Sequence, residues 1–403
     1  MTITDSLFEA FLKCPTKCWL WATNEQPSGN TYAEWVKAQN ESYRIAATEH
    51  LRAQFPSDDC ALSPRVENIK TAKWRLAADV AVAAAAEPAP SILAVETRLH
   101  AIERVPAEGR GKANQFIPIR FIFFNKLNKS DRLLLAFDAF VLSTALGREI
   151  VLGKITHGDD QTTLKVKVSA LAGALRKGLS KITALLSSQT PPDLVLNRHC
   201  AECEFQARCR KIAIEKDDLS LMARMSEKER KLFHNKGIFT IRQLSYTFRP
   251  RRRPRALIGQ KEKYHHALKA LAIREGKIHV AGRPALIING TPVYLDVEGV
   301  PDREFYYLIG VRIETEEGIV QHSLWANTQE EEGIRWRELL SILANITNPV
   351  LIHYGSYEQI FLKKMAKRYA DPENKGSNSG KLFDSLNVLS HVRSSVYFSR
   401  VLQ

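Results

Sequence analysis

The sequence predicts an α/β protein with more than one domain. At 403 residues the chain is long enough for two or three domains, each with its own core. In the first half, helix-forming segments precede and follow β-rich segments, and in the second half three strand-like segments lead into a helix and a further strand. We therefore expect α/β domains over residues 1–215 and 284–403, joined by a basic helical connector over 216–283.

In the first domain, the elements follow from the spacing of apolar residues. Residues 6–12 and 30–55 are expected to be helical, and the second helix is expected to bury Trp35, Ile45, Ala46 and Leu51 in the core. Strands are expected between 74 and 101 and over 116–123, where the second is an inner strand of a sheet. Residues 133–146 are predicted to form a buried helix, and residues 163–187 a longer amphipathic one.

The composition is that of a globular protein with an excess of basic residues. The net charge is +14, and an excess of this size favours a polyanionic partner, although it can also serve solubility alone. Because the sequence has no run of 18 apolar residues and no signal-peptide pattern at its start, we expect no membrane span and a cytoplasmic protein.

Three of the six cysteines, Cys200, Cys203 and Cys209, lie within ten residues of one another. Clustered cysteines in a cytoplasmic protein hold metal more often than they form disulfides, and dense thiolates suit zinc or an iron–sulfur cluster. The best candidate for a fourth ligand is Cys14, although Cys18 follows it by one helical turn and could face the same site.

These cysteine motifs resemble the RecB-like nuclease family, in the branch that carries an iron–sulfur cluster. There, a Phe-x-x-Cys-Pro near the start supplies one thiolate and a later Cys-x-x-Cys-x5-Cys supplies three, as residues 11–15 and 200–209 do here. The resemblance covers about residues 5–215. It implies a restriction-endonuclease-type α/β core and a 4Fe-4S cluster, with zinc as the alternative, on four residues: Cys14, Cys200, Cys203 and Cys209.

The catalytic pattern of that family matches less well. Such enzymes hold divalent metal with an acidic residue and a later Asp/Glu-x-Lys on a strand. His100 stands near the place of the first acid, and Lys126 follows Phe124 and Asn125, which bring no carboxylate. Asp138 fits a solvated or capping role equally well. We therefore expect this module to bind or scaffold and its nuclease site to be degenerate.

The connector carries two candidate phosphate-binding features. Residues 232–244 resemble a helix-hairpin-helix with Gly237 in its turn, although an ordinary αα-hairpin fits as well. Prolines keep the following arginine run extended, so its guanidiniums can contact successive phosphates of a nucleic acid, DNA in preference to RNA, unless the run is only a solvated linker. The run contains Arg249, Arg251, Arg252, Arg253 and Arg255.

The strongest catalytic signal is Asp296-Val-Glu298 on a predicted strand. Side chains at i and i+2 leave the same face of a strand, and two adjacent carboxylates repel unless a cation lies between them. Glu358 follows the fourth strand of the domain. Asp384 is a further candidate, although capping of the following helix would explain it equally well.

This second domain resembles the predicted exonuclease-like RNase H superfamily domains that are fused behind RecB-like modules. The resemblance covers about residues 284–398 and implies Mg²⁺ or Mn²⁺ on Asp296 and Glu298, with Glu358 and Asp384 as further catalytic acids. The family supplies a final acid on a late helix, and nothing acidic follows Asp384 here. We therefore expect a truncated C-terminus, a site of three acids, or a loss of cleavage.

The function expected from these features is metal-dependent cleavage of DNA or RNA phosphodiesters. The alternative is a non-catalytic nucleic-acid-binding protein that retains nuclease folds. A zinc-stapled adaptor for protein partners would leave the arginine run unexplained.

Overall fold

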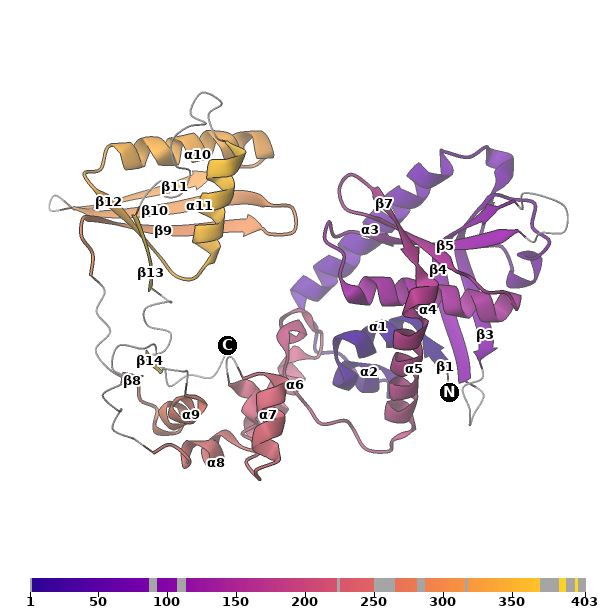
Figure 1. The fold of residues 1–403 in the computed structure, drawn as a ribbon, viewed down its shortest axis with the longest axis horizontal. Helices are drawn as coiled ribbons and strands as arrows, with labels where there is room; N and C mark the ends of the chain where they lie inside the picture. Colours follow the sequence, from indigo (N-terminus) through magenta and orange to yellow (C-terminus); the bar gives the residue numbers. More distant parts are fainter. Residues whose placement is uncertain are drawn as a thin grey trace. The chain divides into compact units, whose positions relative to one another are not determined.

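The computed structural model describes residues 2–86, 93–106, 114–222, 225–249, 265–280, 287–315, 318–369, 384–388 and 396–397. The chain divides into two compact units, Met1–Glu215 and Lys216–Gln403. Each unit contains helices and a mixed β-sheet, so the predicted α/β class is confirmed (Figure 1). In the part of the chain that the structure describes, no helix is long and apolar enough to cross a membrane.

The first unit is built on a seven-stranded mixed sheet. Its long strand β4 (Leu93–Val105) carries β3 (Leu76–Ala86) on one edge and two strands in succession on the other. There, β1 (Thr2–Thr4) pairs with the first half of β4, and β5 (Gln115–Ile122) pairs with the second half. The sheet continues through β6 (Leu152–His157) and β7 (Thr162–Lys167), with β2 (Cys60–Leu62) beside β3. As predicted, β5 is an inner strand.

The prediction of one helix over residues 163–187 is wrong in its first part. Residues 162–167 form strand β7, which pairs with β6, and helix α5 (Ala172–Ser187) begins only after a short 3₁₀ turn. Leu164 and Val168 are four residues apart, which fits a helix, but Val166 between them is also buried. Apolar residues at every second position are typical of a strand with one covered face.

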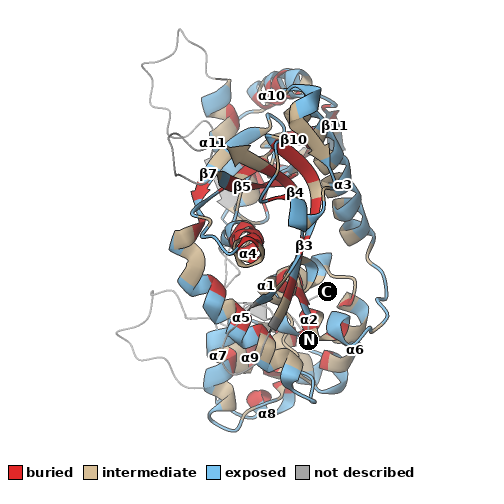
Figure 2. Cartoon of the chain, turned by 90° about the vertical axis from the view of Figure 1, so that its right-hand side faces the viewer, coloured by how far each residue is buried: buried red, intermediate tan, exposed pale blue. Residues whose placement is uncertain are grey.

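Helices cover both faces of this sheet. On one face, α4 (Lys129–Leu146) packs with α1 (Asp5–Lys13) and α5 over the main core, and Figure 2 shows α4 as largely buried. On the other face, α3 (Thr31–Arg52) contributes Ala47, flanked by Tyr43 and Leu51, to a smaller core. Trp35 and Ile45, predicted to be core residues, are 47% and 52% exposed because only this short stripe of α3 contacts the sheet.

Short helices come first among the described residues of the second unit. They are α7 (Glu227–His234), α8 (Ile241–Ser245) and α9 (His266–Glu275). A five-stranded sheet follows, in the order β11 (Gly318–Trp325), β10 (Phe305–Thr315), β9 (Thr291–Val300), β12 (Pro349–His353) and β13 (Asp384–Asn387).

Within this sheet, β9, β10 and β11 are antiparallel, and β12 and β13 run parallel to β9. Helices α10 (Gln329–Ala344) and α11 (Tyr357–Arg368) contribute to the core beneath β9. Alternate residues of β9, namely Val293, Leu295 and Val297, are buried in that core. The residues between them, including Asp296 and Glu298, therefore lie on the opposite face of the sheet.

Candidate functional site

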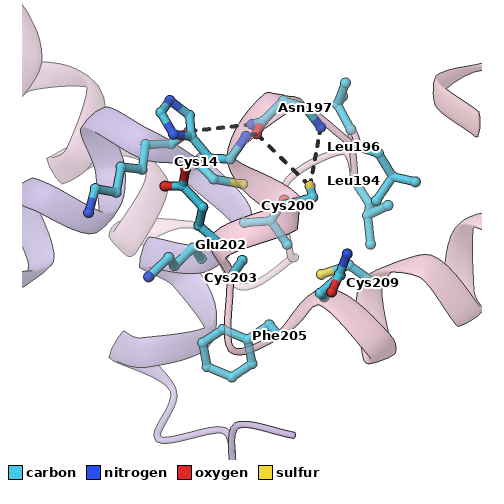
Figure 3. Close-up of a pocket in the computed structure, with 15 residues that line it drawn as sticks. Cys14, Leu194, Leu196, Asn197, Cys200, Glu202, Cys203, Phe205 and Cys209 are labelled. Carbon is cyan, nitrogen blue, oxygen red and sulfur yellow. Dashed lines mark hydrogen bonds between the residues drawn. The ribbon is translucent and has the colours of Figure 1, made fainter. Parts of the chain in front are cut away.

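The two cysteine segments of the first unit line one pocket. Cys14 lies between α1 and α2 (Pro15–Ala22), where Pro15 starts a new helix because its ring cannot continue the old one. Cys200 lies in a 3₁₀ segment and Cys209 in α6 (Gln206–Glu215), with Cys203 between them. All four line the same pocket, whose wall also includes apolar side chains (Figure 3). The structure thus brings together the four predicted ligands from the two ends of the unit.

Burial gives the thiols of the cysteine-rich segment, Cys200, Cys203 and Cys209, a high affinity for protons. It raises the pKa of Cys200 and Cys203, and it raises that of Cys209 to about 11, with further increases from the neighbouring cysteines. A cation that binds these thiols therefore displaces protons from them. A set of four cysteine sulfurs in a partly apolar pocket fits zinc or an iron–sulfur cluster and not Mg²⁺. No group of three or more His, Cys, Asp or Glu among the described residues is already drawn together as a closed metal site.

Cys18 does not share this pocket. Its side chain is buried in the main core of the unit, and burial raises its pKa to about 12. Of the two cysteines one helical turn apart, only Cys14 lines the pocket.

Polar contacts attach the cysteine-rich segment to the start of the chain. Glu204 accepts hydrogen bonds from Lys17 at 2.7 Å and from the Trp21 indole at 2.8 Å. Arg208 bonds to Glu25 at 2.5 Å, and the Asn30 amide donates to the carbonyl of Ala201 at 3.1 Å. Because these bonds hold the two segments together, the positions of the cysteines do not depend on a bound metal alone. Sequence inspection missed this role of Glu204, which directly follows Cys203.

The residues at the expected positions of a RecB-like catalytic site have structural roles in the first unit. The His100 ring accepts a hydrogen bond from the backbone N–H of Phe121 at 2.9 Å, and desolvation, with the nearby guanidinium of Arg120, holds its pKa well below its usual value. Strand β5 ends at Ile122, so Lys126 lies in the following turn and not on the strand. The Asn125 side chain bonds to Asp159 through both its amide and its carbonyl.

Asp138 is neither solvated nor a helix cap. It lies within α4, is buried, and accepts two hydrogen bonds from Arg120 and one from the Thr97 hydroxyl. The carboxylate is therefore neutralised by a guanidinium inside the core. The signal that could have revealed it is Arg120 itself, a cation within an otherwise apolar strand.

Asp79 is a strained carboxylate that the sequence analysis did not single out. It lies in strand β3 with a φ of 58°, a region that residues other than glycine rarely adopt. Arg98 holds it with two hydrogen bonds of 2.6 and 2.7 Å, which lower the pKa of Asp79 to about 2, and Arg44 adds a third at 3.3 Å. An aspartate within a run of alanine and valine was the available signal.

The connector offers less to a phosphate than predicted. Gly237 has a φ of 75°, as a tight turn requires, but the turn amides have partners. The N–H groups of Gly237 and Ile238 bond to carbonyls of α7, and those of Phe239 and Thr240 bond to the Gln243 side chain. Of the arginine run, Arg249 is described and exposed. The others lie outside the described residues: Arg251, Arg252, Arg253 and Arg255.

Asp296 and Glu298 both lie on the exposed face of β9. Across the antiparallel pairing with β10, Asp296 is opposite Gly310 and Glu298 is opposite Leu308. Gly310 brings no side chain to the space beside Asp296, and the cross-strand neighbour of Glu298 brings no charge. The two carboxylates therefore stand together on one open face, as the i, i+2 spacing predicts.

Glu358 approaches the same end of β9 from α11. The side chain is 6% exposed, and its Oε2 atom has no hydrogen-bond partner among the described residues. His353, at the end of β12, is also buried, with its Nδ1 atom 3.5 Å from this oxygen. Burial raises the pKa of Tyr357 to about 12, and the nearby Glu298 and Glu358 both contribute to that increase. Glu298 and Glu358 therefore both lie close enough to Tyr357 to affect its pKa.

Asp384 is not placed with these residues. It is the first residue of β13, where it pairs with Val350. The end of β13 beside His353 is occupied by Asn387, whose side chain accepts a hydrogen bond from the Gly355 N–H at 3.2 Å. Three residues of strand separate Asp384 from that end, about 10 Å.

Comparisons with known proteins leave the family open. No family model matches the chain, and no curated protein matches it. Among solved structures, the crystal structure of SSO0001 is 14% identical over 52% of this chain and 86% of the other, with a TM-score of 0.27. A likeness at this level carries no argument about function.

Proposed function

We propose that the chain is a nuclease that cleaves DNA or RNA phosphodiesters with divalent metal on the sheet of its second unit. Asp296 and Glu298 hold Mg²⁺ or Mn²⁺, and Glu358 completes the clamp or orients water. One observation carries the proposal: Asp296 and Glu298 share the exposed face of β9, and Glu358 lies at the start of α11 with its Oε2 atom 3.5 Å from His353 of the neighbouring strand β12. Such a set of carboxylates is stabilised by a cation, which polarises phosphoryl oxygens and activates water.

The order of elements in the second unit supports its proposed RNase H-like nature. Three antiparallel strands, a helix and a parallel strand follow one another, as the resemblance implies. In the first unit, proposed to be RecB-like, arginines already neutralise two buried or strained carboxylates, Asp79 and Asp138. This supports a binding or scaffolding role for that unit, and we therefore assign the proposed cleavage to the second.

The four cysteines are proposed to hold a 4Fe-4S cluster, with zinc as the alternative. The support is that Cys14, Cys200, Cys203 and Cys209 line one pocket. A metal bound there ties the first helix of the unit to its last segment. The proposed partner is nucleic acid, DNA in preference to RNA, in the cytoplasm, and the arginine run adds contacts to its phosphates.

A second candidate function is nucleic-acid binding without cleavage. The placement of Asp384 favours it, because Asp384 pairs with Val350 at the start of β12, whereas His353 and Glu358 meet at the other end of that strand. Loss of one metal ligand weakens a phosphoryl-transfer site more than it weakens binding of the phosphate backbone.

The two functions separate in one experiment. End-labelled single- and double-stranded oligonucleotides are incubated with the purified protein in Mn²⁺ or in EDTA, and binding is measured in parallel by fluorescence anisotropy. A nuclease cleaves in Mn²⁺ only, and Glu298→Gln abolishes cleavage without abolishing binding. Binding without cleavage under all conditions supports the second function instead.

A further inference from the structure

A row of side chains crosses the open face of the second unit's sheet, from the proposed metal ligands to an exposed tryptophan. In the antiparallel register, Glu298 of β9 is opposite Leu308 of β10, and Leu308 is opposite Trp325 of β11. Residues directly opposite one another in a sheet project from the same face. Trp325 therefore lies on the face that carries Asp296 and Glu298. Two strand spacings, about 10 Å, separate its Cα atom from that of Glu298.

A β-bulge adds a second aromatic ring at this end of the face. The pairing of β10 with β9 shifts its register between Tyr306 and Leu308, so Tyr307 is an extra residue beside Glu298. The ring of Tyr307 stacks on that of Trp325, with the ring centroids 6.2 Å apart and the planes 20° from parallel. The bulge thus supplies the ring that supports the tryptophan from one side.

The aromatic pair is held in place and is still exposed. The Arg335 guanidinium donates a hydrogen bond to the carbonyl of Trp325 at 2.8 Å, and the Ala326 N–H donates to the carbonyl of Tyr307 at 2.9 Å. Trp325 is nevertheless 55% exposed, although an indole is among the largest apolar groups that a fold can bury. A fixed and exposed aromatic ring of this kind suits a flat ligand.

We propose that Trp325, supported by Tyr307, is a stacking platform for an unpaired base of the nucleic-acid substrate. The inference rests on the proposed nuclease function, because its ligand is the strand whose phosphate binds beside Asp296 and Glu298. Successive phosphates of one strand lie about 3.4 Å apart along a helix, so a span of about 10 Å corresponds to about three nucleotides. The stacked base therefore belongs to a nucleotide within about three positions of the scissile phosphate.

This platform defines the class of substrate as single-stranded nucleic acid or the unpaired end of a strand. Bases within a duplex stack on one another, whereas an unpaired base can stack on an aromatic side chain, and every base has a π face for that contact. An apolar protein partner fits this face less well. It would have to cover Asp296 and Glu298 as well, and burial of carboxylates without a cation or a hydrogen-bond donor is costly.

The test measures binding in EDTA, separately from cleavage, by fluorescence anisotropy of labelled oligonucleotides. The oligonucleotides are a single strand, a blunt duplex of the same sequence and an abasic strand of the same length. Trp325→Ala is expected to weaken binding of the single strand by about 10-fold, with the salt dependence unchanged because no phosphate contact is lost. Trp325→Phe should restore most of the affinity. The duplex and the abasic strand should bind equally to wild type and Trp325→Ala.

The matched control is Ile319→Ala, which trims another exposed apolar side chain on the same face of β11. It should bind the single strand as the wild type does. Circular dichroism and the thermal midpoint establish that all three variants fold. An equal loss of affinity in Ile319→Ala overturns the proposal, because exposed apolar area would then be sufficient without an aromatic ring.

The remaining outcomes separate this inference from the function on which it rests. Single-strand affinity that is unchanged in Trp325→Ala, or that falls equally for the duplex or the abasic strand, overturns the stacking platform. Mn²⁺-dependent cleavage by the wild type then leaves the nuclease function standing. Base-dependent binding that requires Trp325, in a wild type that does not cleave in any divalent metal, supports the platform and contradicts the nuclease function.

Discussion

Arg120 and Asp138 form a buried ion pair that joins strand β5 to helix α4. The guanidinium donates two hydrogen bonds, from Nε to Oδ2 at 2.7 Å and from Nη2 to Oδ1 at 2.8 Å. The Thr97 hydroxyl donates a third to the same carboxylate at 2.6 Å, and Asp5 lies 3.6 Å from the guanidinium. A pair with this geometry offsets the cost of taking both charges out of water, provided that both partners remain.

Removal of one partner should therefore destabilise the first unit strongly. Asp138→Ala is expected to lower its free energy of unfolding by about 3–5 kcal/mol, because the buried Arg120 loses both of its hydrogen bonds to Asp138 and keeps only the longer contact with Asp5. Urea unfolding followed by circular dichroism measures the change. Glu41→Ala, which removes an exposed partner of Arg44, should cost less than about 1 kcal/mol. An equal loss of unfolding free energy in the two variants would show that the buried pair stabilises the unit no more than the exposed one does.

Asp79 makes stability depend on pH in acid. Its pKa is about 2 in the folded chain, against an ordinary value of 3.8, because Arg98 stabilises the carboxylate. A lowered folded-state pKa contributes stability that is fully present above the unfolded value and is lost as pH falls through the folded value. Stability should therefore fall between about pH 4 and pH 2. The urea midpoint should change less with pH across this range in Asp79→Asn than in the wild type. An equal change in both proteins would show that Asp79 does not cause the pH dependence.

Much of the second unit could be predicted because the local spacing of apolar residues determines its strands and helices. Alternating burial along β9 places Asp296 and Glu298 on the open face, and the order of strands and helices over residues 291–368 follows the periodicity of the apolar residues. The meeting of Cys14 with Cys200 was expected only from the spacing of a known motif, since no local rule joins residues so far apart in sequence.

The remaining features depend on tertiary contacts. Asp138 resembles a surface residue until Arg120 is seen across the helix–sheet interface. The strained backbone of Asp79 is held by Arg98 from the neighbouring strand. Tyr357 gains its position from the absence of a side chain at Gly299. Each of these pairs joins two different elements, and the apolar periodicity of an element does not show which other element it contacts.

The cysteine pocket makes a contrasting prediction for two cysteines that are four residues apart. Cys14→Ser should lose the bound metal, because Cys14 lines the pocket, whereas Cys18→Ala should keep it and lose about 1 kcal/mol of stability from the core. Iron and zinc contents and visible absorption of anaerobically purified protein measure the outcome. Zinc with no iron would favour the zinc alternative. Metal loss in Cys18→Ala with retention in Cys14→Ser would contradict the assignment of the ligands.

Nucleic-acid affinity should fall steeply with salt concentration, since each neutralised phosphate releases counterions. Substitution of Arg251, Arg252 and Arg253 by alanine should flatten the dependence of log affinity on log salt by roughly two to three units. The matched control removes the same charge from exposed lysines of the first unit. These are Lys165, Lys167 and Lys181. A control that flattens the slope equally would show that net charge matters and the arginine run does not.

The measurement that tests the central claim most directly compares Asp296→Ala with Lys126→Ala in Mn²⁺-dependent cleavage under single-turnover conditions. Asp296 shares the open face of β9 with Glu298, whereas Lys126 lies in the turn after β5 and not on the strand. Asp296→Ala should therefore lower the rate by at least about 100-fold, and Lys126→Ala should leave it within about twofold of the wild type. Cleavage that survives Asp296→Ala and is lost in Lys126→Ala would place the active site in the first unit and contradict this account.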